Sequence, residues 1–508
     1  MSVMSTSSQK GCSFLWKTPS RIFIPEDFTP NEQLMIQTAD AFVRKEILPV
    51  LDRLDQQEEG LMQKLIKKAG ELGFCGVDAP EAYGGIELSK NLASRILEFL
   101  SLNGSFSVTI GVTSGVAQLG LTLFGTESLK KKYLPGLISG KEIGAYALSE
   151  PNSGSDALSL STTADQKGDH YVLNGTKMWI TNAKWASIFT VFARTSAQNI
   201  SAFIVERNTP GLIIEREEHK MGLKGSSTAR IVLDNVRIPG KNLLYQEGKG
   251  HIVAFNVLNL GRLKLSAMSL GSAKEAIAQA DLYAKERSQF GQTIAEFPII
   301  KRKFTLARAL YFAAESMIYR TGAAIDQIFS ELDESKNSIP ETLEAFAVES
   351  SICKVFSTEI QNLIIDEMLQ VLGGYGFSEE FPLARLYRDC RVSRIYEGTN
   401  EINRLFIAKR ILQQIEIKGA GLTPSGDSSI SELLGNAYPK LPSDQISHSA
   451  FADLLILNYA EQSARIRANQ TGEIEKKLYA IFGMWANIRT AEAYQALTGA
   501  SVNLPAGI

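Results

Sequence analysis

The 508-residue chain has little of the residue types on which most metal and thiol chemistry depends. Its four histidines lie too far apart for a local metal motif such as HExxH. Its four cysteines, Cys12, Cys75, Cys353 and Cys390, form no CxxC pair, so we expect reduced, structural thiols in a cytoplasm-like compartment. We expect no metal site.

The chain also has no excess of charge of one sign. It carries 53 lysines and arginines against 55 aspartates and glutamates, a net charge of −2, so it has no basic field to hold nucleic acid. It contains no P-loop, no GxSxG elbow and no GxGxxG motif opening a βαβ unit. We therefore expect no nucleic-acid partner, and a chemistry outside those three classes of site.

Two stretches bear on targeting and membranes. The first 25 residues have no apolar run long enough for a secretory signal, and we predict a bacterial-type cytoplasmic location. They are Ser-rich and free of acids before Glu26, so a transit peptide and the mitochondrial matrix are the alternative. Residues 104–125 carry no charge and could span a bilayer by length, but their polar residues and glycines favour a buried helix.

Patterning predicts a mainly helical α+β chain of about three domains with additions at both ends. A capping box at residues 29–32 begins the first helical region, and long apolar-periodic helices return from about His251 as an antiparallel four-helix bundle. The predicted parts are an N-terminal extension (1–28), a helical domain (29–145), a middle β domain (146–250), a bundle (251–415), a flexible linker (416–430) and appended helices (431–508).

The middle region has the texture of an antiparallel sheet or small barrel. Residues 171–173 and 178–180 alternate on either side of Asn174-Gly175, which is a hairpin signal. Further short strands are predicted at 189–193, 202–205, 212–214 and 229–233, separated by Gly, Pro, Asn and Asp. This spacing argues against a parallel Rossmann sheet.

A candidate catalytic carboxylate lies in a short link between two helices. Glu397 stands between Tyr396 and Gly398, and the glycine leaves room for a planar ligand to approach the main chain. Taken alone, a glutamate in such a turn is most often a solvated charge. Its interpretation therefore depends on the other motifs in the chain.

Three segments together resemble the acyl-CoA dehydrogenase family, and the resemblance covers about Phe28 to Arg410. They are Tyr146-Ala147-Leu148-Ser149-Glu150-Pro151-Asn152-Ser153-Gly154-Ser155-Asp156, Lys177-Met178-Trp179-Ile180-Thr181-Asn182, and Arg394 to Arg404. The appended helices resemble those of the very-long-chain branch. The resemblance implies an FAD-dependent enzyme in which Glu397 takes the α proton of an acyl-CoA thioester, and an enclosed site would raise the pKa of Glu397.

The same resemblance implies the other site residues. FAD would contact Tyr146, Leu148, Ser149, Gly154, Ser155, Trp179, Ile180, Thr181, Thr399 and Glu401, and in a neighbouring subunit Arg287, Phe290, Gln370, Gly373 and Gly374. Acyl-CoA would contact Ser155, Asn259, Arg262, Tyr396 and Gly398. A flavin shared between chains implies a homo-oligomer, either a dimer or a tetramer.

Some positions depart from the family pattern. The alternative base position of some relatives, directly before Arg262, is Gly261 here, which leaves Glu397 as the candidate. Pro298 follows Phe297 where relatives often have Gln or Gly, and it removes a donor. Tyr245 replaces a common glycine and is expected to alter the loop before the bundle.

We expect long-chain fatty acyl-CoA oxidation in β-oxidation, with an electron-transfer flavoprotein as acceptor. Ser107, Gly111 and Gly115 form a small-residue face that suits either a long acyl chain or close helix packing. An acyl-CoA oxidase and a scaffold protein that keeps the fold are the alternatives. The appended helices are expected to pack on a partner subunit or to make peripheral membrane contact.

Overall fold

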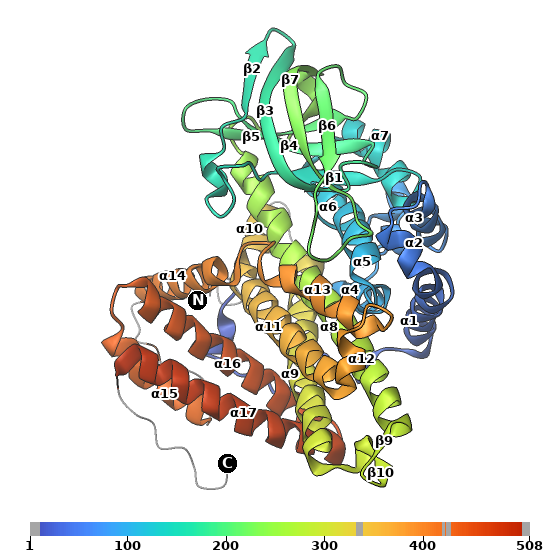
Figure 1. Ribbon diagram of the computed structural model, residues 1–508. Helices are drawn as coiled ribbons and strands as arrows, with labels where there is room; N and C mark the ends of the chain where they lie inside the picture. Colours follow the sequence, from blue (N-terminus) through green and yellow to red (C-terminus); the bar gives the residue numbers. More distant parts are fainter. Residues whose placement is uncertain (1–10, 332–338, 419–421, 423–427, 500–508) are drawn as a thin grey trace. The chain divides into compact units, whose positions relative to one another are not determined.

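The computed structural model describes residues 11–331, 339–418, 422 and 428–499, and it divides into two compact units (Figure 1). One unit is Pro30–Lys264, and the other combines Met1–Thr29 with Leu265–Ile508. The expected linker at 416–430 and the link at 331–340 lie largely outside the described residues. The mainly helical α+β class predicted from the sequence is confirmed.

The unit Pro30–Lys264 begins with helices whose N-termini are capped as their sequences predict. The side chains of Ser89, Asn103 and Thr126 each accept a hydrogen bond from the backbone N–H group three residues ahead, which satisfies donors that a helix leaves free. The main helices are α1 (Pro30–Phe42), α2 (Leu51–Asp55), α3 (Leu61–Glu71), α4 (Lys90–Leu100), α5 (Gly104–Gly111), α6 (Gln118–Phe124) and α7 (Glu127–Ile138).

The uncharged stretch is helical and mostly buried. α5 continues through a π-helical segment, Val112–Ala117, into α6, and Gly115 within that segment has φ −97° and ψ −108°. Gly104–Phe124 is the one stretch among the described residues long and apolar enough to cross a membrane, but 78% of its most apolar window lies inside the protein. It is the buried helix expected from its polar residues and glycines.

A mixed sheet follows the helices, in the order β6-β7-β3-β2-β4-β5-β8 with β1 paired to β4. Most neighbours are antiparallel, as predicted, but β1 and β2 both pair with β4 in parallel. The strands are β1 (Gly144–Ala147), β2 (Thr163–Lys167), β3 (His170–Thr181), β4 (Ile188–Arg194), β5 (Ile200–Glu206), β6 (Leu212–Glu217), β7 (Thr228–Pro239) and β8 (Leu243–Leu244). Phe189, Val191, Phe203 and Ile231 are among the side chains of its fully buried core.

The predicted hairpin at Asn174-Gly175 is wrong. β3 runs straight through these residues, and the hairpin turn is Gly168-Asp169, between β2 and β3. Gly175 lies instead where the register of β3 against β7 shifts, which marks a bulge. A Cβ at Gly175 would lie 2.4 Å from Thr162 Oγ1, so the glycine is explained by a close approach rather than by a turn.

The second unit is a helical bundle with further helices packed on it. α8 (Gly250–Glu286) enters this unit at Leu265, and a short hairpin of β9 (Ser288–Gln289) and β10 (Gln292–Thr293) leads to the next helix. The helices that follow are α9 (Pro298–Ser330), α10 (Ile339–Ala345), α11 (Ala347–Leu372), α12 (Gly374–Phe377), α13 (Pro382–Cys390) and α14 (Asn400–Lys418). Pro298 is the first residue of α9, where a missing N–H costs nothing.

The appended residues form α15 (Ser429–Ala437), α16 (Gln445–Gln470) and α17 (Glu473–Thr498). α16 lies beside α17 and also packs against α9, α11 and α14 of the bundle (Figure 1). The N-terminal segment joins the same core, since Phe14 meets the ring of Tyr459 at 4.9 Å and Gln470 exchanges two 2.9 Å hydrogen bonds with the backbone of Ile22. Both ends of the described chain are therefore built into this unit.

Candidate active site

The turn that carries Glu397 has an uncommon backbone. Glu397 has φ +56° and Gly398 has φ +79°, so two consecutive residues adopt the left-handed conformation. Glycine adopts it freely, but for glutamate it costs energy and requires support from the surroundings. The turn precedes α14, and Thr399 Oγ1 accepts the N–H of Ile402 at 3.2 Å.

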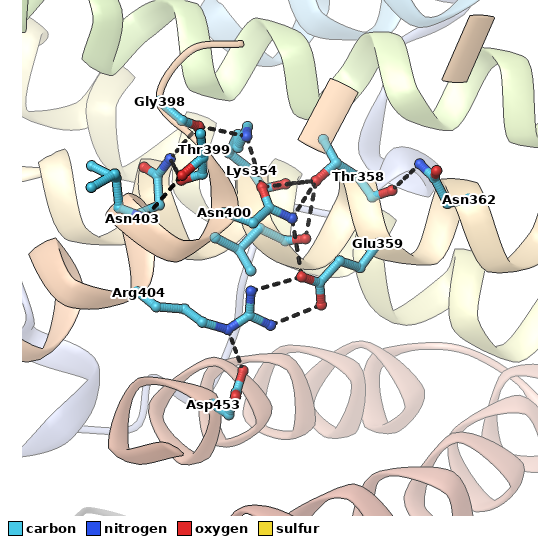
Figure 2. A network of polar contacts seen from close by, with 12 residues as sticks. Lys354, Thr358, Glu359, Asn362, Gly398, Thr399, Asn400, Asn403, Arg404 and Asp453 are labelled. Carbon is cyan, nitrogen blue, oxygen red and sulfur yellow. Dashed lines mark hydrogen bonds and ion pairs between the residues drawn. The ribbon is translucent and has the colours of Figure 1, made fainter. Parts of the chain in front are cut away.

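Two side chains hold this turn by its carbonyl groups, as Figure 2 shows. Lys354 of α11 donates from Nζ to Gly398 O at 2.8 Å and to Asn400 Oδ1 at 2.7 Å. Asn403 donates from Nδ2 to Gly398 O at 2.8 Å and to Thr399 O at 3.0 Å. Lys354 is fully buried, so its charge strengthens these bonds in a low dielectric. These hydrogen bonds hold the backbone around Glu397 in place.

Tyr396 precedes the candidate base and is half-buried. Burial raises the pKa of the Tyr396 phenol, and the neighbouring Glu397 carboxylate raises it further. The phenol is therefore neutral at physiological pH and offers an uncharged wall beside Glu397.

The two predicted flavin-binding segments lie side by side in the unit Pro30–Lys264. Met178 N donates to Ser149 O at 2.9 Å. Lys177 Nζ donates to Leu148 O at 3.2 Å and forms a 2.7 Å ion pair with Glu150. Both charged side chains are buried, and Glu150 also accepts hydrogen bonds from Ser161 and Thr162. A buried ion pair thus ties the first segment to the second.

This region offers an open surface of the kind that a flavin ring requires. Trp179 is 60% exposed with φ +62°, although its neighbours Lys177 and Ile180 are buried. Gly154 and Ser155 are exposed, and no atom lies within 4 Å of where a Cβ on Gly154 would be. The exposed indole on a left-handed backbone leaves a planar apolar face on which a ligand ring can stack. The residues present fit FAD.

The remaining predicted residues of this unit occupy different environments. Tyr146 is half-buried, with its ring 5.0 Å from that of Phe192. Leu148 and Ile180 point into the protein, so the backbone is what they can offer a cofactor. On α8, Arg262 Nη1 donates to Asn259 Oδ1 at 3.0 Å, which pairs the two predicted CoA contacts.

The bundle unit separates its predicted flavin contacts into two groups. Thr399 and Glu401 lie beside the Glu397 turn, and a backbone hydrogen bond lowers the pKa of Glu401. Arg287, Phe290, Gln370, Gly373 and Gly374 are exposed, and they lie on the β9–β10 hairpin and at the C-terminal end of α11. Along α11, Gly373 is roughly 28 Å from Lys354, which holds the turn. Phe290 is 94% exposed.

Several residues that shape the site were not anticipated from the sequence. Glu150, Lys177 and Asn403 lie within the quoted segments but are not among the predicted contacts, and Lys354 lies outside those segments. One signal was available, because Lys354 stands in an apolar helix between Cys353 and Val355, where a solvated lysine is not expected. The asparagine gave no comparable signal.

Comparison with known proteins identifies the family. Sequence profiles of the acyl-CoA dehydrogenase N-terminal, middle and C-terminal domains match residues 29–141, 145–236 and 248–412. A probable acyl-CoA dehydrogenase of Bacillus subtilis is 42% identical over 451 residues, covering 87% of this chain and 76% of its own. The chain belongs to the acyl-CoA dehydrogenase family. It is therefore an FAD-dependent dehydrogenase, as the resemblance implied.

Solved structures show how much of the enzyme is shared. An acyl-CoA dehydrogenase of Bacillus anthracis, complexed with FAD, covers 96% of this chain and 90% of its own with a TM-score of 0.87 and 39% identity. A butyryl-CoA dehydrogenase of Megasphaera elsdenii matches over 99% of its length but covers 76% of this chain, with a TM-score of 0.70 and 32% identity. About a quarter of this enzyme is thus additional to the shorter relative.

A rat very long-chain specific acyl-CoA dehydrogenase is 38% identical over 397 residues. That match covers 76% of this chain and 57% of the relative.

Proposed function

We propose that the enzyme removes the α and β hydrogens of an acyl-CoA thioester, with Glu397 as the base that takes the α proton. The observation that carries this role is the turn itself, because Glu397 is held with φ +56° while Lys354 and Asn403 fix the carbonyl next to it. Such strain is typical of residues whose exact direction matters to chemistry. FAD, when bound, supplies the two-electron acceptor for the β hydrogen.

The other residues bind and orient the substrate. The backbone N–H of Glu397 is the proposed donor to the thioester oxygen, where charge develops as the α proton leaves. Tyr396 and Gly398 flank the thioester, and the raised pKa of Tyr396 keeps a second negative charge away from the carboxylate. Arg262, oriented by Asn259, suits the nucleotide end of CoA, and Ser155 is the remaining proposed contact.

A long fatty acyl chain is the proposed substrate, in fatty acid β-oxidation. The small-residue face is supported at Gly115, where a Cβ would meet one atom within 4 Å, Lys264 Cδ at 3.8 Å. The π-helical segment around Gly115 widens the helix, and such segments are frequent at functional sites. At Ser107 helix packing accounts for the small side chain, since its hydroxyl donates to Ser101 Oγ at 2.7 Å.

Each flavin is proposed to be shared by two copies of the chain. The two groups of flavin contacts in the bundle unit are roughly 28 Å apart along α11, which suits two different flavins better than one. The outward Phe290 and the open space around Gly373 and Gly374 fit a partner's dinucleotide. The expected assembly is a dimer or tetramer in a bacterial-type cytoplasm, with an electron-transfer flavoprotein as acceptor.

Replacing Glu397 with Gln tests the proposal. The variant should keep its yellow flavin, because Gln has the same size, but flavin bleaching by acyl-CoA should slow by roughly 10²- to 10⁴-fold. Glu416→Gln, an exposed carboxylate on α14, the helix that follows the Glu397 turn, is the matched control and should bleach normally.

The substrate series is run from four to more than sixteen carbons, and we expect the fastest bleaching from about fourteen carbons upward. Wild-type bleaching in Glu397→Gln would show that the base is misassigned. An optimum at four carbons would overturn the chain-length proposal alone. Reoxidation of the bleached enzyme by air as fast as by an electron-transfer flavoprotein would favour the oxidase alternative.

A further inference from the structure

The appended helix α16 makes a charged contact with α14, the helix that directly follows the Glu397 turn. Asp453 of α16 accepts a hydrogen bond from Arg404 Nε of α14 at 2.8 Å (Figure 2). Side-chain exposure is 14% for Arg404 and 35% for Asp453, so this contact is partly shielded from solvent. Ion pairs of this kind contribute more than those on an open surface, and they fix geometry as well.

The contact does not end at Arg404. The two terminal nitrogens of Arg404 donate to the two oxygens of Glu359 on α11, at 2.7 and 2.9 Å. Glu359 Oε1 in turn accepts from Asn400 Nδ2 at 3.0 Å. All three nitrogens of the guanidinium are therefore engaged, one with the appended helix and two with the bundle.

Asn400 completes the connection to the turn. Its Oδ1 accepts from Lys354 Nζ, and the same ammonium group donates to Gly398 O, directly after Glu397. An unbroken series of hydrogen bonds thus runs from Asp453 through Arg404, Glu359, Asn400 and Lys354 to Gly398, as Figure 2 shows.

The charges in this series depend on each other. Burial alone would raise the pKa of Glu359, but its hydrogen bonds and ion pair with Arg404 outweigh burial and lower it. Burial raises the pKa of Asp453, and Arg404 offsets that effect only in part. A cavity of about 750 Å³, lined by Arg404, Asp453, Glu359 and Trp485 among others, leaves the guanidinium room to move once a partner is removed.

We propose that the appended helix α16 positions the catalytic turn, with Asp453 acting through Arg404 on the hydrogen bonds that hold Gly398. Asp453 is a positioning residue: it touches neither substrate nor flavin, and its effect is on the direction of the Glu397 side chain. The proposal rests on the role of Glu397 as the base, and it gives the appended region a part in catalysis.

Asp453→Asn in the full-length holoenzyme tests the proposal, with two readouts. Amide hydrogen exchange of residues 395–400 should accelerate, because the series that holds the turn is weakened at its origin. The rate of flavin reduction at saturating acyl-CoA should fall by about 3- to 10-fold with little change in KM, a loss of up to about 1.4 kcal/mol of transition-state stabilisation. Asp453→Glu, which keeps the charge, should recover part of both.

Asp444→Ala is the matched control, because Asp444 caps the start of the same helix by accepting the N–H groups of Ile446 and Ser447 at 2.9 Å. It should weaken the capping of α16 and leave both readouts unchanged. Equal effects of Asp444→Ala and Asp453→Asn would overturn the proposal, because α16 would then act through stability alone. The proposal would also be overturned if Asp453→Asn accelerated amide hydrogen exchange without slowing flavin reduction, or slowed flavin reduction without accelerating the exchange. Exchange is measured without substrate, so a wild-type enzyme that no acyl-CoA reduces would contradict the proposed function separately.

Discussion

Two fully buried lysines, one in each unit, hold the segments that carry the proposed chemistry, and they do so with different partners. Lys177 in the sheet meets the carboxylate of Glu150 and the carbonyl of Leu148. Lys354 in the bundle meets the carbonyl of Gly398 and the side-chain oxygen of Asn400. Lys177 joins two parts of the proposed flavin platform through an ion pair with Glu150. Lys354 orients a strained turn through hydrogen bonds to two uncharged oxygens, one of the backbone and one of a side-chain amide.

The difference indicates what each lysine contributes. Removing Lys177 leaves a buried carboxylate without its cation, which is a large cost to stability. Removing Lys354 leaves acceptors short of a donor, a smaller cost, but it frees the backbone next to the base. The flavin platform should therefore respond to mutation mainly in stability and flavin retention, and the turn mainly in rate.

The largest effect is expected from Lys177→Met. Breaking this buried pair should lower the free energy of unfolding by about 3–5 kcal/mol and weaken flavin retention, measured by denaturant unfolding and by the flavin absorbance left after gel filtration. The double variant Lys177→Met with Glu150→Gln should recover part of the loss, because it carries no unpaired charge. A single variant as stable as wild type and fully yellow would show that the pair holds nothing together.

The same variant has a pH signature. In wild type, burial would raise the pKa of Glu150, but the Lys177 charge and hydrogen bonds hold it at about 2. Glu150 therefore stabilises the fold above its ordinary pKa of 4.5 and loses that contribution as the pH falls toward 2. Without Lys177 the carboxyl group takes up its proton at higher pH, so the stability gap between variant and wild type should narrow from pH 7 to pH 5.

The second-largest effect is expected from replacing Lys354, the buried lysine of the bundle unit. Lys354→Met keeps an unbranched side chain one atom shorter but removes the donor to Gly398 and Asn400, so the left-handed turn at Glu397 should relax. Flavin reduction by acyl-CoA should slow by about 10- to 100-fold, equivalent to about 1.4–2.7 kcal/mol, while the flavin stays bound. If Lys354→Met lost its flavin but reduced the remaining flavin at the wild-type rate, the two lysines would have the same role and the distinction between them would be wrong.

Sequence patterns predicted most of the fold because its elements carry local signals. The capping-box sequence at residues 29–32 predicts the start of α1, which begins at Pro30, and the long helices predicted from about His251 are present as α8, α9, α11 and α14. The hairpin prediction was wrong because an Asn-Gly pair can form a hairpin turn or can place a glycine at a close contact within a strand. At Asn174-Gly175 the glycine makes room for Thr162, a neighbour that no local pattern reveals.

The candidate site likewise has one part that sequence motifs predicted and another part that they did not. Glu397, Trp179 and Gly373 stand in motifs that the family resemblance marks, so their positions were available from the sequence. The side chains that hold them were not, since Lys354 is 43 residues before Glu397 and Asp453 is 56 residues after it. Contacts between segments so far apart are set by helix packing, which the order of residues alone does not specify.

The smallest effect is expected at a buried carboxylate in the bundle unit that lacks a pair like that of Glu150. Glu349 of α11 accepts the N–H of Cys12, and burial raises its pKa from 4.5 to about 7. Because the folded state holds this proton more tightly than the unfolded chain, the contribution of Glu349 to stability is full below about pH 4.5 and is lost as the pH rises through 7. Glu349→Gln cannot titrate, so it should exceed wild type in unfolding free energy by about 1–2 kcal/mol at pH 8 and match it near pH 5. Denaturant melts at both pH values measure the gap. A gap of the same size at both values would show that packing, and not the proton, distinguishes the two side chains.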